Sequence, residues 1–268
     1  MSFTFPRVSR LLKCLRVSAI LALLTGSASL VEARPHWEEV SAEDLAATES
    51  KSSPGADSEI IFSRHILDNS ETATWTENHI QAKIYTQKGV EDAAIFSITF
   101  SKDYRASGIA ARAIKPDGTS VELSAKDFRE TTVYKRGGFE FKRTSFTFPN
   151  LQPGDLVEYR WVEHVIDAYF SRYTFVCQAE VPTREYSFNV EGSRTDFDLM
   201  WFNCPAVERE PKGKKIVIRN LPAFVEEPMM PPENEFRGWI TIIFSHPYMR
   251  FYKNDSAWQM LGQNLAGC

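Results

Sequence analysis

Cysteine, excess charge and long apolar runs are all scarce in this sequence, and each shortage excludes a class of protein. Four cysteines in 268 residues are too few for the disulfide frameworks of small secreted domains. A formal net charge of −4 gives no electrostatic reason to bind nucleic acid or an anionic membrane surface. Beyond residue 33, no apolar run approaches the roughly 20 residues that a membrane-spanning helix needs.

Motifs that carry chemistry are scarce as well. The five histidines include no His-x-His or His-x3-His pair, and no two cysteines have the Cys-x2-Cys spacing of a zinc site. Neither Cys177, in a strand-like run, nor Cys204, before a proline, lies where a thiol would be activated as a nucleophile. Carboxylate pairs for glycoside hydrolysis are assembled in space, and the sequence singles none out. We therefore predict no catalytic residue, no metal site and no cofactor.

The first 33 residues have the three parts of an export signal. Basic residues up to Arg16 precede an apolar run from Val17 to Leu30, and Val-Glu-Ala at 31–33 supplies the small side chains of a cleavage site. The alternative is a membrane anchor, but the run is short for a span. Removing residues 1–33 changes the net charge from −4 to −7. The pattern predicts a soluble periplasmic or extracellular product with no membrane span after signal removal.

The rest of the sequence predicts an all-β protein. Residues 34–58 form a polar lead-in with one short helix expected at 41–49. From Glu59 onward apolar residues recur with a period of two, in segments separated by turns that contain glycine or proline. These segments are 75–85, 95–100, 109–114, 139–148, 156–163, 184–190, 215–221 and 239–244. We predict an antiparallel β-sandwich of many short strands over 59–250, with one or two subdomains, and a short linker-like C-terminal helix in 251–268.

Two segments give sharper local predictions. Pro-Asp-Gly at 116–118 predicts a hairpin turn with Gly118 at positive φ. In 156–163, Trp161 shares an apolar face with Tyr159, so we expect Trp161 to be buried between sheets while Glu158 and Arg160 lie on a wet face.

A change of phase in the segment 139–148 gives a third prediction. Phe139 and Phe141 occupy odd positions, whereas Phe146 and Phe148 occupy even ones. A continuous strand would send the two pairs to opposite faces. We therefore expect either that both faces are covered or that a bulge near 143–145 restores the phase.

The order of these elements carries a family resemblance. The matching segments are 55–62, 75–85, Ala-Ile-Lys-Pro-Asp-Gly at 113–118, Phe-Thr-Phe-Pro-Asn-Leu-Gln-Pro-Gly-Asp-Leu-Val-Glu-Tyr at 146–159, and Val181-Pro182 with the strand after it. Over roughly 37–265 the chain resembles a bacterial exported domain of unknown function that precedes transglutaminase-like domains. The resemblance implies a β-sandwich fold, an extracytoplasmic location and a papain-like Cys-His-Asp domain downstream. This chain would then be the non-catalytic N-terminal half.

Aromatic and basic residues gather in or next to predicted turns. Such side chains suit a sugar, a peptide or an acidic partner. The alternative is that the aromatic rings close the ends of the core while the charges are solvated. The candidate binding residues are Tyr104, Arg105, Tyr134, Arg136, Tyr169, Phe170 and Arg172.

The internal cysteines allow one covalent prediction. Cys14 is lost with the signal, so an oxidising compartment would act on Cys177, Cys204 and Cys268. A disulfide between Cys177 and Cys204 would leave Cys268 free. The alternative is that both internal thiols are inert core residues.

The leading functional hypothesis is therefore an exported, non-catalytic β-sandwich module that binds a ligand or assists a transglutaminase-like protein. A cell-envelope glycan, a peptide or another exported protein would be its partner. The competing hypothesis is a hydrolase, or a transglutaminase-like cysteine protease whose catalytic domain is absent from this chain.

Overall fold

The structure is a computed structural model that describes residues 37–71, 73–101, 104–165, 172–210 and 213–245. The chain divides into two compact units, 1–37 and 38–268, and the description below concerns the second. The helices are α1 (Ala42–Ala46), α2 (Gln87–Ala93), η1 (Ala125–Asp127) and η2 (Glu233–Glu235). The strands are β1 (Ser58–Asn69), β2 (Thr74–Ile84), β3 (Ile95–Ser101), β4 (Tyr104–Ile114), β5 (Ser120–Glu122), β6 (Arg129–Arg136), β7 (Phe139–Thr147), β8 (Leu156–Val165), β9 (Arg172–Val176), β10 (Thr183–Ser193), β11 (Phe197–Phe202), β12 (Val207–Arg209), β13 (Lys215–Leu221) and β14 (Trp239–Phe244).

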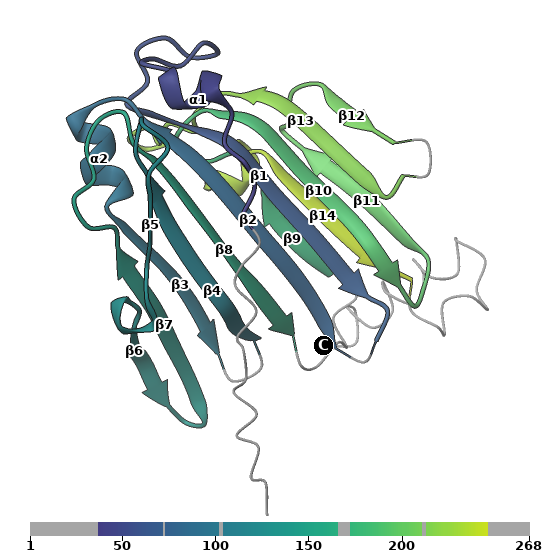
Figure 1. Cartoon of the computed structure of the whole chain (residues 1–268). Coiled ribbons are helices and arrows are strands. Elements are labelled where there is room, and N and C mark those ends of the chain that lie inside the picture. The colour runs from purple at the N-terminus through teal and green to yellow at the C-terminus, as the bar shows by residue number, and fades with distance from the viewer. Residues whose placement is uncertain (1–36, 72, 102–103, 166–171, 211–212, 246–268) are drawn as a thin grey trace, which may run out of the picture. The chain divides into compact units, whose positions relative to one another are not determined.

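One large sheet forms the first layer of the fold. Its eight strands have the order β12-β13-β10-β1-β2-β8-β4-β5 (Figure 1). Its neighbouring strands pair antiparallel except β1 and β10, which run parallel. The predicted all-β fold class is confirmed, and the large sheet contains this one parallel pair among its antiparallel neighbours.

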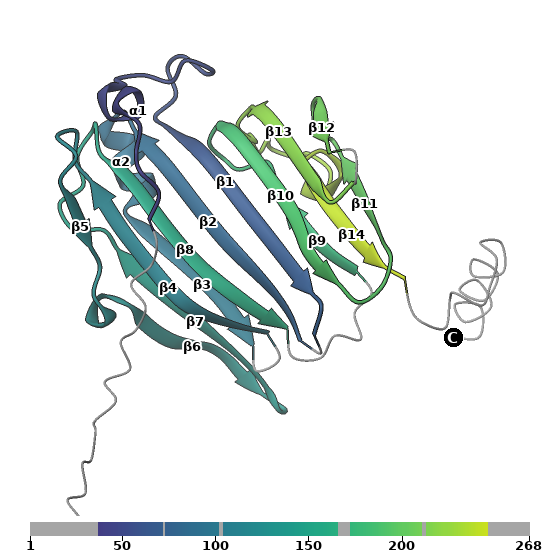
Figure 2. The same ribbon diagram turned by 45° about the vertical axis from the view of Figure 1, so that its right-hand side comes forward.

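Two three-stranded sheets form the second layer. Their orders are β11-β14-β9 and β3-β7-β6. The first packs Ile240 and Ile242 of β14 against Phe188 of β10, and the second packs Phe146 of β7 against Val157 of β8. A single row across the large sheet pairs Tyr186 with Ser63, Ser63 with Ile80 and Ile80 with Tyr159, so both small sheets cover the same face. Figure 2 shows them as separate parts of this second layer.

The N-terminal segment 38–57 covers the other face of the large sheet. Val40 and Leu45 pack on a buried cluster of Ile61, Phe62, Ile114 and Leu156. The expected lead-in helix is α1, where the Ser41 hydroxyl accepts a hydrogen bond of 3.0 Å from the Asp44 amide. The predicted wet face of β8 is wrong at Glu158, whose side chain is fully buried. The N-terminal segment 38–57 covers this face of β8. The alternation of residues along β8 cannot reveal a cover that comes from a distant part of the sequence.

The local predictions have different outcomes. Gly118 has φ of 85° in the β4–β5 turn, and Trp161 is buried with its ring stacked on Tyr159, so both predictions are confirmed. Strand β7 is continuous, and the register shift lies on β6 between Thr132 and Tyr134. The expected bulge near 143–145 is therefore wrong.

The other predicted alternative, that both faces of β7 are covered, is also wrong, because only one face is covered. Phe139 is 67% exposed and Phe141 is 42% exposed, while Phe146 and Phe148 are buried. A continuous strand has sent the two pairs to opposite faces, as its period of two requires. The predicted C-terminal helix in 251–268 lies outside the described residues. Within the described ranges, no helix has the length and apolar character needed to cross a membrane.

Candidate binding cleft

A cleft opens on the inner face of the large sheet, beside strand β9 of one small sheet. It has a volume of about 300 Å³. Strands β1, β2, β4 and β8 supply its floor, and β9 supplies one wall. We call it the central cleft; its lining residues are His65, Thr76, Asn78, Tyr104, Trp161, Glu163, Val165, Tyr173, Thr174, Phe175 and Val176.

The floor of the central cleft is polar because strand β2 changes character along its length. Its inward positions Ile80 and Ile84 are apolar, and Ile84 belongs to the core cluster under sheet β3-β7-β6. The preceding inward positions are Thr74, Thr76 and Asn78, all buried. Strand β2 therefore places apolar residues under sheet β3-β7-β6 and places hydroxyl and amide groups at the central cleft. Buried polar groups of this kind need hydrogen-bond partners, which fixes their orientation.

His65 of β1 lies at the centre of this polar group. Its Nδ1 is 2.7 Å from Asn78 Oδ1, and its Nε2 is 2.9 Å from Ser63 Oγ. The Asn78 amide nitrogen donates to the Thr76 carbonyl at 3.3 Å, so Oδ1 is the atom that faces the imidazole. The neutral ring then donates from Nδ1 and accepts the Ser63 hydroxyl proton at Nε2. Burial lowers the pKa of His65 to about 4, so the ring is uncharged at neutral pH.

Ser63, His65 and Asn78 have the connectivity of a nucleophile, a base and an orienting group. Three observations argue for a structural network instead. Ser63 is buried and is not among the residues that line the central cleft. The lowered pKa of His65 makes the ring a weak base. Asn78 carries no charge to stabilise an imidazolium. The geometry therefore favours support of the cleft floor over activation of Ser63.

The opposite end of the central cleft is aromatic. Trp161 Nε1 donates to Glu163 Oε1 at 2.8 Å, and the Tyr104 hydroxyl also hydrogen-bonds Glu163. Burial raises the pKa of Tyr104, and the adjacent Glu163 carboxylate raises it further. On the wall, Tyr173 Oη donates to Thr74 Oγ1 at 3.1 Å. The rings are thus held by their polar atoms and leave their apolar surfaces for packing.

The two thiols predicted to form a disulfide lie together in the core between the large sheet and sheet β11-β14-β9, where Cys204 packs against the buried cluster that contains Cys177. Cys177 Sγ and Cys204 Sγ are 3.2 Å apart, and both cysteines are free. Contact with the Cys204 sulfur and burial raise the pKa of Cys177. Cys177 is therefore a thiol at neutral pH, not a thiolate nucleophile. A disulfide needs a sulfur separation of about 2.05 Å, so the bond remains a prediction to which this proximity lends support.

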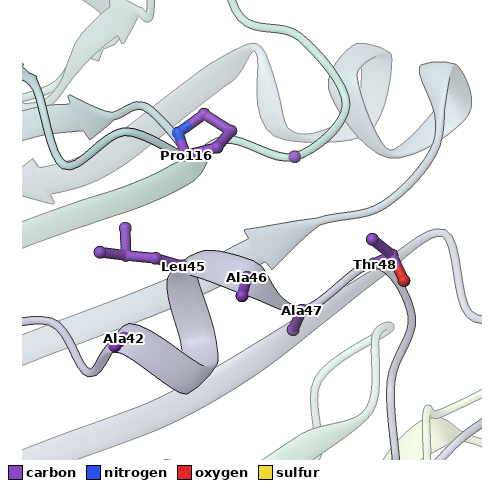
Figure 3. Close-up of a pocket in the computed structure, with 7 residues that line it drawn as sticks. Ala42, Leu45, Ala46, Ala47, Thr48 and Pro116 are labelled. Atoms are coloured by element: carbon purple, nitrogen blue, oxygen red, sulfur yellow. The ribbon is translucent and has the colours of Figure 1, made fainter.

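A second hollow, of about 340 Å³, lies beside α1. Figure 3 shows Ala42, Leu45, Ala46, Ala47, Thr48 and Pro116 around it, and Gly154 completes its lining. Thr48 supplies the one polar side chain of this set. Ligand sites combine apolar walls with several convergent polar groups, which this hollow does not offer. The central cleft is therefore the stronger candidate.

Comparison with known proteins assigns the chain to a family. The model of a domain of unknown function with solved-structure structure (DUF3857) matches residues 70–222, which is more than half of the chain. The chain belongs to this family. No curated protein matches the sequence of this family member. The matched range contains β2, β4, β8 and β9 but begins after His65 of β1.

Solved structures support the fold. A "putative protease" from Parabacteroides distasonis ATCC 8503 is similar, with a TM-score of 0.59 and 14% sequence identity. The likeness covers 70% of this chain and 40% of that one, so this chain spans less than half of that protein's length. At this identity the likeness shows the fold alone.

Two further likenesses have TM-scores below 0.5, which is too low to indicate a shared fold. Native yeast LTA4 hydrolase has a TM-score of 0.36 and 9% identity over 70% of this chain and 29% of that one. A "putative nutrient binding protein" from Legionella pneumophila has a TM-score of 0.33 and 8% identity over 73% of this chain and 70% of that one.

The candidate binding residues from the sequence occupy several places in this family member. Tyr104 lines the central cleft. Arg105 follows it on β4 and is exposed, while Tyr134 and Arg136 lie on the exposed outer face of β6. Arg172 begins β9 and is exposed, and Tyr169 and Phe170 lie outside the described residues.

Sequence reasoning missed His65, Asn78 and Glu163 as cleft residues. A usable signal was present on β1, since Ser63 and His65 are two residues apart and so share a face of a strand. Their partner Asn78 lies on β2, and only the strand register brings it opposite His65. The sequence cannot supply that register.

Proposed function

We propose that this chain is an exported, non-catalytic β-sandwich module that binds a polar ligand in the central cleft. The observation that carries the proposal is the cleft itself, where amide, hydroxyl and carboxylate groups converge beside aromatic rings. Such a combination is typical of ligand sites on otherwise close-packed folds. The ligand class is a cell-envelope glycan or peptide, because the lining offers hydrogen bonds and ring surfaces with little charge.

We further propose that the module is an accessory domain of a transglutaminase-like protein, as the family resemblance implies. The signal-like residues 1–33 support export to the periplasm or beyond. The fold likeness covers 40% of a protein described as a "putative protease", so a similar fold occurs there within a longer chain. That arrangement supports an accessory role. Reading the gene past codon 268 for a Cys…His…Asp domain tests this part.

Ligand binding is tested by titrating the purified chain with a panel of cell-envelope glycans and peptides. We expect Glu163→Gln to weaken the binding of any cleft ligand by about tenfold, because a charged hydrogen-bond acceptor is lost. Glu140→Gln on β7 is the matched control, since Glu140 lies outside the cleft and pairs with Lys135. Equal binding by the two variants would place the ligand elsewhere. A panel without any binder would remove the binding role.

A hydrolase is the second candidate, and the Ser63–His65–Asn78 arrangement is the one observation that favours it. A fluorophosphonate probe labels an activated serine covalently. We expect no labelling, because Ser63 is buried and His65 is a weak base. Labelling of the wild type that is lost in Ser63→Ala would reverse the assignment and make the module an enzyme.

A further inference from the structure

Among the strands that the structure describes, β9 has one edge without a partner, and this edge borders the central cleft. It is the last strand of sheet β11-β14-β9 and pairs with β14 alone among the strands that the structure describes. Four of its residues, from Tyr173 to Val176, line the cleft. An open strand edge presents a row of backbone donors and acceptors to whatever lies beside it.

The hydrogen-bond pattern identifies which backbone groups of β9 point away from β14. The Cys177 amide donates to the Gly238 carbonyl at 3.0 Å, so Cys177 directs its backbone groups toward β14. Successive residues of a strand alternate in this respect. Phe175 and Tyr173 therefore bond to β14 as well, whereas Thr174 and Val176 turn their N–H and C=O groups away from β14, on the side of the cleft.

The second layer of the sandwich is interrupted beside this edge. Its other half is sheet β3-β7-β6, in which β3 is one of the two edge strands. Figures 1 and 2 show β9 and β3 as the strands of the two small sheets that lie nearest each other, over the middle of the large sheet. The two halves belong to separate sheets, so the described strands leave the facing edges unjoined.

We propose that the central cleft binds an extended peptide, which adds as a strand to the free edge of β9. This inference rests on the proposed function and names its ligand class. The peptide backbone pairs with Thr174 and Val176, which provides affinity without regard to sequence. A glycan has no repeating row of N–H and C=O groups to match this edge. The backbone geometry therefore selects a peptide over a glycan.

The floor of the cleft sets the preference for side chains. Alternate residues of an added strand point toward the floor. There they meet the Asn78 amide, the Trp161 ring and the Glu163 carboxylate. Glu163 accepts hydrogen bonds from Trp161 and Tyr104 and retains further lone pairs. Inward side chains that carry donors or positive charge are therefore favoured, and acidic ones are disfavoured.

A matched pair of variants separates backbone pairing from side-chain contact. Val176→Pro removes the amide proton that points away from β14, and it leaves the ladder to β14 intact because that proton is not part of it. Val176→Ala shortens the side chain and keeps the proton. The probe is a library of random heptapeptides blocked at both ends, selected on the full chain. We expect Val176→Pro to weaken selected peptides at least about tenfold, and Val176→Ala to weaken them less than about threefold.

Chemical changes in the peptide provide a second readout that does not depend on the folding of a variant. N-methylation at alternate residues of a selected peptide should abolish binding, and methylation at the intervening residues should not. Hydrogen exchange at the Thr174 and Val176 amides should slow when the peptide binds. If neither Val176→Pro nor N-methylation of the peptide changes the affinity, strand addition is overturned, while the cleft remains a binding site. If only glycans bind, and Glu163→Gln weakens that binding, strand addition is likewise overturned and the cleft remains a binding site. Failure of every ligand would remove both proposals.

Discussion

His65 is the residue through which the central cleft responds to pH. Asn78 and Ser63 hold its two ring nitrogens, and the rings of Tyr186 and Phe175 lie within 5.0 Å and 6.3 Å of it between ring centroids. None of these neighbours carries a charge that would stabilise an imidazolium. Burial therefore dominates, and the folded protein prefers the neutral ring.

The free energy of unfolding should fall between about pH 6.5 and pH 4 because of this residue. The pKa of His65 is about 4 in the folded chain and about 6.5 when unfolded, so the unfolded state binds the extra proton in that interval. The shift corresponds to about 3 kcal/mol. Urea unfolding of the wild type and His65→Gln at pH 7.5 and pH 4.5 measures it. Carboxylates contribute equally to both proteins, so a wild type that loses no more stability than the variant would contradict the prediction.

At the scale of elements, the β4–β5 turn shows how a short sequence determines backbone shape. The Gly118 amide donates to the Lys115 carbonyl at 2.9 Å, and the Lys115 amide donates to the Thr119 carbonyl at 2.8 Å. Asp117 Oδ1 accepts from the Thr119 amide at 2.8 Å. Gly118 has positive φ, and a Cβ added there would meet no atom within 4 Å. Any penalty for a side chain at Gly118 therefore comes from the backbone conformation alone.

Gly118→Val should lower the free energy of unfolding by about 1 kcal/mol or more, because a β-branched residue is strained at positive φ. Gly118→Asn is the matched control, since asparagine tolerates the left-handed region and should retain most of the stability. Chemical denaturation of the two variants measures the difference. If valine proves as stable as asparagine at this position, backbone strain does not govern this turn.

Elements of this kind are the part of the fold that sequence can predict. Pro-Asp-Gly at 116–118 requires a particular turn, and the period of two marks most strands and their faces. That period does not say which strands pair. The parallel pairing of β1 with β10 joins segments more than 100 residues apart, and it was not predicted. The central cleft depends on these pairings, so its residues were mostly missed, with Tyr104 the exception.

At the scale of the whole molecule, buried charges fix the N-terminal segment to the large sheet. Arg184 of β10 bonds to Asp44 of α1 at 2.5 Å and to Glu59 of β1 at 2.9 Å. Burial opposes ionisation of the fully buried Glu59, but hydrogen bonds from Ser52, Arg184 and Ser50 outweigh it and lower its pKa. Lys83, also fully buried, donates to the Leu45 carbonyl at 2.9 Å. A polar lead-in therefore completes the fold.

Arg184→Met should destabilise the molecule by about 3 kcal/mol, because it leaves the buried Glu59 carboxylate without its cation. Arg219→Met is the matched control. Arg219 of β13 also bridges two carboxylates, Glu185 and Glu208, but these pairs are exposed and should contribute about 1 kcal/mol or less.

Both variants are compared by urea unfolding at pH 7.5 and by the rate of tryptic cleavage after Lys51. We expect faster cleavage in Arg184→Met alone, because loss of the Asp44 and Glu59 contacts releases the segment that carries Lys51. Equal stability and equal cleavage in the two variants would mean that the apolar contacts of Val40 and Leu45 hold the segment without help from charge.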